Sequence, residues 1–176
     1  MALTGTYNAD PIHSSILWSV HHGGIAAFRG WFEGFEGTLD ASGDAPKLQG
    51  ATKVENISIR TPDMFRQHLL GEEFFDAENH PEITFSSTNV DLRDDGTATV
   101  EGDLTIRGNT KPITATGTWV GPSETHAGRR VALDVETTIN RFDYDIHWQA
   151  PPLPGGGSSL ADEVTVRFTV QFAAAE

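Results

Sequence analysis

The chain has 176 residues, of which 38% are hydrophobic, 12 are basic and 25 are acidic, and it contains no cysteine. This length suits a single domain over residues 1–176, and the formal net charge of −13 disfavours nucleic acid and anionic lipid surfaces as partners. The lack of cysteine excludes disulfides and thiolate chemistry.

The N-terminal residues 1–7 lack a basic segment followed by an apolar run. No stretch of the sequence approaches the roughly 20 apolar residues that span a bilayer. We therefore expect a cytoplasmic protein without stable membrane insertion; a signal peptide removed from a longer precursor is the alternative.

Residues 16–32 alternate with a period of two, which places their apolar side chains on one face of an extended chain. That face carries Ile16, Trp18, Val20 and His22, followed by Phe28, Gly30 and Phe32. Gly23 and Gly24 between the two runs predict the turn of a β-hairpin.

A strand over Ala51–Ile59 is expected next, followed by a short helix over residues 62–71. Thr61 is the expected N-cap, with Pro62 in the first helical position and an end near Gly71. The apolar side of this helix, with Phe65 and Leu69, should lie against the sheet.

Four further strands follow with the same alternation. Their inward faces are expected to hold Ile83 and Phe85; Ala98, Val100, Gly102, Leu104 and Ile106; Ile113, Ala115, Gly117 and Trp119; and Val131, Leu133, Val135, Thr137 and Ile139. Turns are expected at 94–96 and at Gly108-Asn109, and the last strand alternates from Val164 to Phe172.

Consecutive strands joined by short turns form an antiparallel sheet, and closing it removes the exposed edges. We therefore predict an all-β fold, an eight-stranded antiparallel barrel with one short helix. Small residues on the inward face (Ala98, Gly102, Ala115 and Gly117) leave room for a guest, whereas a lumen filled by side chains is the alternative. The Pro- and Gly-rich segment 150–159 is either a surface loop or a lid at the barrel mouth.

Several motifs together resemble the YceI-like family of lipocalin-like polyisoprenoid-binding proteins. They are His13-Ser14, Ile16-x-Trp18-x-Val20-x-His22, Phe28-x-Gly30-x-Phe32-x-x-Phe35-x-Gly37, Arg66-x-His68-Leu69, Phe74-Phe75-Asp76, Pro81-x-Ile83-x-Phe85, Gly102-x-Leu104-Thr105-Ile106-x-Gly108-x-Thr110-Lys111 and Ile139-Asn140-Arg141-x-Asp143. The resemblance implies a bacterial barrel, secreted or cytoplasmic, with a long apolar pocket for an isoprenoid tail and no catalytic residues. The sequence departs from the family pattern at 142–145 and in the extended loop.

The sequence offers little support for catalysis or metal binding. His21 and His22 are adjacent on a strand and face opposite sides, so with His13 they do not form a metal site. The carboxylates Asp10, Asp143, Asp145 and Glu163 lie in no catalytic motif.

The candidate ligand-binding residues are aromatic and aliphatic side chains on inward faces or beside the barrel ends. They are Trp18, Val20, His22, Phe28, Phe32, Phe65, Leu69, Phe74, Phe75, Phe85, Trp119, Phe142, Trp148 and Phe168. The candidates for a polar head group are Arg60, Arg66, His68, Lys111 and Arg141, for which solvated surface charge is the alternative.

The expected function is non-enzymatic binding, storage or transport of a long apolar ligand, a polyisoprenoid or an isoprenoid quinone, with no cofactor. The alternatives are an enzyme acting on an isoprenoid or polyketide, for which His22 is the inward polar candidate, a partner-binding barrel with a filled core, and a haem carrier. A homodimer is a further open alternative.

Overall fold

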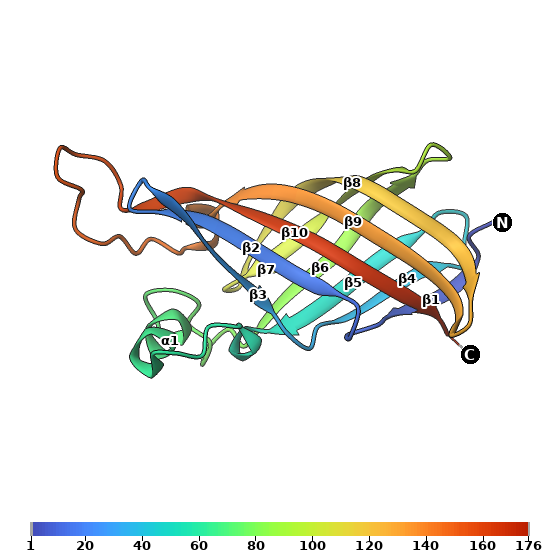
Figure 1. Cartoon of the computed structure of the whole chain (residues 1–176), viewed down its shortest axis with the longest axis horizontal. Coiled ribbons are helices and arrows are strands. Elements are labelled where there is room, and N and C mark those ends of the chain that lie inside the picture. The colour runs from blue at the N-terminus through green and yellow to red at the C-terminus, as the bar shows by residue number, and fades with distance from the viewer. Residues whose placement is uncertain (1, 176) are drawn as a thin grey trace.

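The computed structural model describes residues 2–175 and contains ten strands, one α-helix and two short 3-10 helices in that range. The strands are β1 (Gly5–Ala9), β2 (Ser15–His22), β3 (Ala26–Phe32), β4 (Glu36–Ala41), β5 (Lys47–Lys53), β6 (Glu82–Leu92), β7 (Thr97–Ile106), β8 (Asn109–Thr125), β9 (Gly128–Asn140) and β10 (Leu160–Ala174). The helices are η1 (Val54–Asn56), α1 (Asp63–Leu70) and η2 (Arg141–Tyr144). In Figure 1 the strands wrap around one long axis, with α1 at one end and the last residues of β10 at the other.

The sheet closes into the predicted eight-stranded antiparallel barrel. Its order is β1-β4-β5-β6-β7-β8-β9-β10, and β1 pairs again with β10. The long strand β10 pairs with β1 through Phe172–Ala174 and with β2 through Leu160–Thr169. Strands β1 and β2 therefore serve as two halves of one barrel strand, and β4 and β3 as two halves of the next.

Both of these strands are interrupted at the same level of the barrel. At the first interruption Asp10 Oδ1 accepts a hydrogen bond from the backbone N–H of Ile12 (3.0 Å), and at the second Gly34 adopts a left-handed conformation (φ +59°). Beyond the interruptions β3 pairs with β2 and with no other strand in residues 2–175. On its other side Phe32 forms an isolated bridge with Ile57 of the segment after β5. The edge of β3 therefore borders a gap in the ring of strands.

The segment after β5 fills the resulting gap, and here the predicted strand over Ala51–Ile59 is wrong beyond Lys53. Val54 N–H still donates to Pro81 O (2.8 Å), in register with the pairing of β5 and β6. The chain then leaves the sheet at a tight turn in which Ile57 N–H donates to Val54 O (3.1 Å). Ser58 N–H then donates to Trp31 O (2.8 Å), which attaches this segment to β3.

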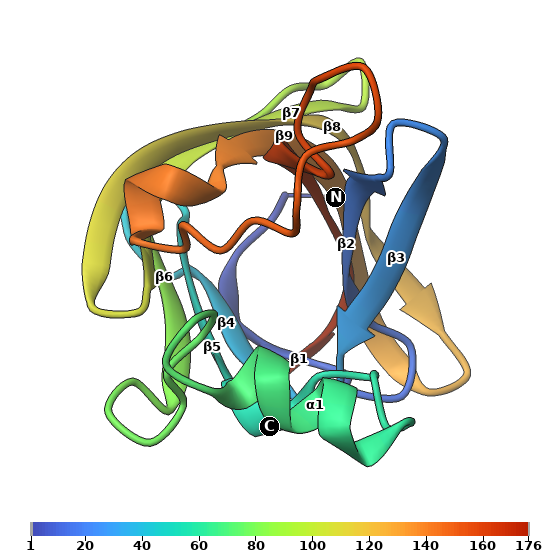
Figure 2. The same ribbon diagram turned by 90° about the vertical axis from the view of Figure 1, so that its left-hand side faces the viewer.

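The predicted helix is confirmed as α1, and its end at Gly71 is correct. Its start is not capped as expected: Pro62 holds the N-cap position, and no side chain caps the helix there, so Thr61 has no capping role. Figure 2 shows α1 lying across one end of the barrel below the lumen. No helix within residues 2–175 has the length and apolar character to cross a membrane.

The predicted alternation of faces is confirmed in the central strands. On β7 the inward residues Ala98, Val100, Leu104 and Ile106 are all buried. One turn is shifted by a residue: Ile106 pairs with Asn109, so Arg107 and Gly108, both left-handed, form the two-residue loop in place of Gly108-Asn109.

The end of the barrel opposite α1 is filled by side chains. Tyr7, Leu39, Val131 and Phe172 belong to one cluster there and are 1–2% exposed. Trp119 packs against this cluster, and its indole N–H donates to Arg93 O (2.8 Å). Tight packing therefore closes this end of the lumen.

Candidate ligand-binding site

The half of the barrel nearer α1 encloses a cavity of about 730 Å³. Volumes of roughly 300–1,000 Å³ are typical of small-molecule sites. Twelve of the fourteen predicted ligand-binding residues line it, namely Trp18, Val20, His22, Phe28, Phe32, Phe65, Leu69, Phe74, Phe75, Phe85, Trp148 and Phe168. Whether they contact a ligand stays a prediction.

The partial exposure of inward-facing side chains shows that this half of the lumen is hollow. Ile83, Ile113, Val164 and Phe168 line the cavity yet are only half-buried. In a close-packed interior the same positions would be covered by neighbouring atoms. The filled-lumen alternative therefore describes only the far end of the barrel.

Two of the four small residues expected to leave room do not do so. A Cβ on Gly102 would lie 2.5 Å from Phe85 Cζ, and one on Gly117 would lie 2.1 Å from the carbonyl oxygen of Asp134. These glycines admit a neighbouring ring and a neighbouring strand, not a guest. Ala98 belongs to the filled end, and Ala115 alone of the four lines the cavity.

Two glycines form a part of the cavity wall that the sequence analysis did not predict. Gly37 of β4 and Gly50 of β5 are direct partners across the sheet, and both line the cavity. Glycines at paired positions of neighbouring strands are the signal that could have located this part of the wall.

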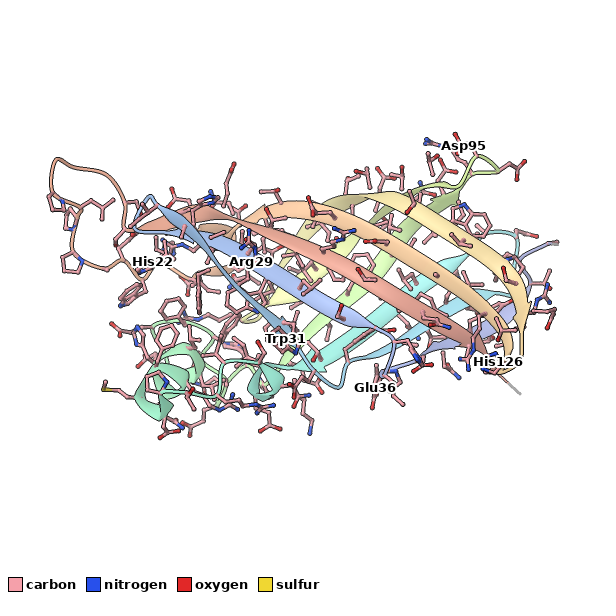
Figure 3. All side chains as sticks on the ribbon, in the orientation of Figure 1. His22, Arg29, Trp31, Glu36, Asp95 and His126 are labelled. Atoms are coloured by element: carbon pink, nitrogen blue, oxygen red, sulfur yellow. The ribbon has the colours of Figure 1, made fainter. Side chains whose placement is uncertain are left out.

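Figure 2 shows the β2–β3 turn, α1 and the loop 147–159 together at one end of the barrel. The cavity opens at this end, where some of its lining residues are exposed. Three residues of the hairpin, His22, Ile25 and Ala26, line the cavity and are also exposed to solvent. In Figure 3 His22 lies at this end, whereas Asp95 and His126 lie at the opposite end.

Aromatic side chains form two groups around the mouth. On the hairpin side the Phe28 ring lies 5.2 Å from Trp18 and 5.8 Å from Phe65 of α1. The second group joins His68, Phe74 and Trp148, with ring centroids 5.0–5.3 Å apart. These edge contacts fix α1 and the chain after η2 beside the opening.

Two predicted cavity residues lie elsewhere. Trp119 points inward, but in the filled end of the barrel. Phe142 of η2 stacks on His147 with ring centroids 5.1 Å apart, and the Arg141 guanidinium carbon lies 4.5 Å from its ring centre. Neither side chain lines the cavity.

Most of the predicted head-group residues are engaged in other contacts. Arg66 donates to the carbonyls of Ile57 (3.1 Å), Ile59 (3.2 Å) and Glu55 (2.6 Å), which ties α1 to the segment before it. Arg60 pairs at the surface with Glu33 (2.6 Å), and Lys111 is exposed on β8 away from the cavity. These three are therefore not part of the cavity wall.

Arg141 lines the cavity but is 4% exposed and serves the loop around it. Its guanidinium donates to the carbonyls of Ala161 (3.0 Å), Ile146 (2.7 Å) and Trp148 (2.8 Å). Burial lowers the pKa of the guanidinium, and Asp162 at 3.7 Å opposes that shift. Among the predicted head-group residues, His68 alone lines the cavity without such backbone contacts in the described chain; its Nδ1 lies 3.4 Å from Glu73 Oε2.

The polar groups of the cavity wall are few. Tyr144 was not predicted; it lines the cavity, and burial raises the pKa of its phenol to about 12. The wall contains no carboxylate from residues 2–175, and no cluster of three His, Cys, Asp or Glu side chains in that range could hold a metal ion. The wall can bury an apolar molecule, but it presents little that could transfer a proton or bind an ion.

Comparison with known proteins agrees with this architecture. The UPF0312 protein of Pseudomonas putida is 30% identical over 170 residues, covering 92% of this chain and 84% of that protein. The UPF0312 protein of Pseudomonas savastanoi pv. phaseolicola is 32% identical over 158 residues, covering 86% and 80%.

Solved structures share the fold at lower identity. Burkholderia cenocepacia BcnA matches with a TM-score of 0.75 at 22% identity over 93% of this chain and 98% of its own. A domain from Saccharophagus degradans, described as polyisoprenoid binding and implicated in plant cell wall breakdown, matches with a TM-score of 0.71 at 15% identity over 96% and 98%. The family model for the YceI-like domain matches residues 7–172. The chain therefore belongs to the YceI-like domain family.

Proposed function

We propose that this protein binds, and thereby stores or transports, a long apolar molecule in its barrel, and that the ligand is a polyisoprenoid or an isoprenoid quinone. One observation carries the proposal: the barrel holds a cavity of about 730 Å³ with an almost wholly apolar wall. Packed side chains close the barrel at one end of this cavity, and the cavity is open at the other end. The description of the Saccharophagus degradans domain as polyisoprenoid binding supports the ligand class.

Burial of the tail accounts for the affinity. Each buried methylene contributes about 0.8 kcal/mol, so a five-carbon isoprene unit contributes roughly 4 kcal/mol before costs. Association costs roughly 4–15 kcal/mol in lost freedom, which a tail of about four units offsets. A specific head-group contact is therefore not required for binding.

The role is a binding one and not a catalytic one. General acid–base chemistry needs a positioned proton donor and acceptor beside the reacting bond. Of the histidines on the wall, His22 is exposed at the mouth and His68 faces a Glu73 carboxylate that is 69% exposed outside the cavity. We expect the ligand to leave the barrel chemically unchanged.

Native mass spectrometry of protein purified from its own host, followed by organic extraction, tests the proposal. We expect a co-purifying apolar mass and, after delipidation, stoichiometric uptake of an isoprenoid quinone supplied in dilute detergent. A protein that carries no such mass and takes up no isoprenoid from detergent would refute it. A porphyrin mass would instead support the haem-carrier alternative, with His22 at the mouth as the available ligand.

A further inference from the structure

The chain at one side of the mouth carries no charged residues, although the protein as a whole is strongly acidic. Residues 11–28 and 146–161 contain no Asp, Glu, Lys or Arg, in a chain that is 21% charged. At that average the two stretches together would hold about seven charged side chains. The net charge of −13 is thus carried by other parts of the surface.

These two stretches meet in space. His22 of β2 pairs with Leu160 of β10, and Gly23 N–H donates to Ser159 O (2.7 Å). A Cβ on Gly24 would lie 3.5 Å from Leu153 Cδ1, so Leu153 of the loop lies against the tip of the hairpin. Figure 1 shows both segments at the end of the barrel that also holds α1.

Exposed apolar side chains lie on this end. Ile25, at the tip of the hairpin, is 89% exposed, and Met64, in the first turn of α1, is 81% exposed. Ile25 also lines the cavity, so the apolar wall reaches the outer surface at this residue. Large exposed apolar residues beside a binding cavity are typical of an interaction surface.

We propose that this region is a docking surface for an electrically neutral lipid bilayer, and that the ligand moves between bilayer and cavity across it. We call it the neutral rim and define it as residues 20–28 and 147–159 together with Met64. The inference rests on the proposed function, because a bilayer is the apolar phase in which a long isoprenoid resides.

The distribution of charge favours a neutral bilayer over other partners. A segment without charged side chains can enter the interfacial region of a membrane without the free-energy cost of desolvating an ion. An anionic surface would be repelled by the acidic remainder of the protein, and a basic protein partner would need the carboxylates that the rim lacks. The proposal therefore concerns weak, reversible docking and not insertion.

Flotation with vesicles tests the docking step. We expect the protein to float with vesicles of pure phosphatidylcholine and to float less when phosphatidylglycerol is added. Ile25→Asp should weaken this association about tenfold, and Ile25→Asp with Met64→Asp should abolish it. The matched control is Val120→Asp, which changes an apolar residue that is 65% exposed on β8 and should leave flotation unchanged.

Two ways of supplying the ligand separate this inference from the proposed function. An isoprenoid quinone in dilute detergent should load wild type and Ile25→Asp equally, whereas the same quinone in phosphatidylcholine vesicles should load Ile25→Asp about tenfold more slowly. Failure of wild type to load from detergent would overturn the proposed function. Loading from detergent without flotation, or equal loading of both proteins from vesicles, would overturn the docking surface alone.

Discussion

Arg141 illustrates how a charged side chain on a cavity wall can hold together the chain around the cavity. Its guanidinium joins the start of η2 to the carbonyls of Ile146, Trp148 and Ala161, which lie near the two ends of the loop 147–159. The planar fork of arginine suits several acceptors at once.

Replacing this arginine should therefore destabilise the protein. We expect Arg141→Met to lower the free energy of unfolding by about 3 kcal/mol, because buried carbonyl groups lose their donors. Chemical denaturation measures this change. The control is Arg60→Met, which removes a surface pair with Glu33 and should cost less than about 1 kcal/mol. A fully stable Arg141→Met that had lost affinity only for ligands with an anionic head would contradict this structural role.

Tyr144 gives the protein a stability that depends on pH in the alkaline range. Its hydroxyl is buried without a hydrogen-bond partner among residues 2–175, and desolvation raises its pKa to about 12 from a usual value near 10. Above pH 10 the unfolded chain loses this proton first, so the free energy of unfolding falls between about pH 10 and pH 12, by roughly 2–3 kcal/mol.

The variant Tyr144→Phe should remove that part of the pH dependence. At pH 7 it should be as stable as wild type or slightly more so, because it deletes an unpaired buried hydroxyl while keeping the ring. Urea unfolding at pH 7 and at several values above pH 9.5 measures both effects. Parallel stability curves for the two proteins throughout the alkaline range would show that the phenol is not the group responsible.

At the scale of elements, the sequence was informative where side chains repeat and uninformative where the chain changes direction. Period-two alternation correctly predicted the faces of β7 and β9 and the hairpin of β2 and β3, because alternate residues of a strand must face opposite sides. The interruption at 10–14 and the course of the chain after Lys53 depend on single contacts, such as Ser58 N–H to Trp31 O, between residues far apart in sequence.

The residues of the candidate site were likewise predictable only in part. Aromatic residues such as Trp18 and Phe168 could be placed on the cavity wall from the period-two alternation of their strands alone. The guanidinium groups of Arg66 and Arg141 could not be assigned, since their partners are backbone carbonyls and no side-chain pattern marks them. The alternation also does not indicate that the lumen is hollow at Phe168 and filled at Trp119.

Filling the hollow half of the lumen should reduce ligand capacity without unfolding the barrel. Val164 of β10 faces the cavity and is half-buried, so Val164→Phe would extend into open space. We expect an unfolding free energy within about 1 kcal/mol of wild type and uptake limited to shorter isoprenoids. Titration with isoprenoid alcohols of increasing length measures this limit.

Two further variants serve as controls for that experiment. Val120→Phe, on the outer face of β8, should bind every tail length as wild type does. Gly117→Ala should instead destabilise the barrel, because its Cβ would overlap the carbonyl of Asp134 on β9. Unchanged uptake of long tails by Val164→Phe would place the ligand elsewhere.

At the scale of the whole molecule, net charge and an apolar lumen together favour ligands with small uncharged heads. The formal charge of −13 opposes an anionic head at the mouth, and Arg60, Arg66 and Arg141 are either paired or bound to carbonyls. Affinity should therefore depend on the tail.

We expect an isoprenoid alcohol to bind at least as tightly as the diphosphate with the same tail, with little change between low and high salt for the alcohol. Binding titrations of both ligands at two salt concentrations measure this. A diphosphate that binds orders of magnitude more tightly, with steep salt dependence, would require a cationic head-group site.

The filled end of the barrel has a consequence for how a long ligand is exchanged. Because Tyr7, Leu39 and Phe172 close the lumen opposite the mouth, a tail cannot pass through the protein. If the proposed ligand binds, its tail must enter first and leave last along the same path, so loading and unloading would be reversals of one movement. Each additional isoprene unit must then be withdrawn past the same aromatic side chains before release, and the time that a ligand stays bound should lengthen steeply with the number of units it carries.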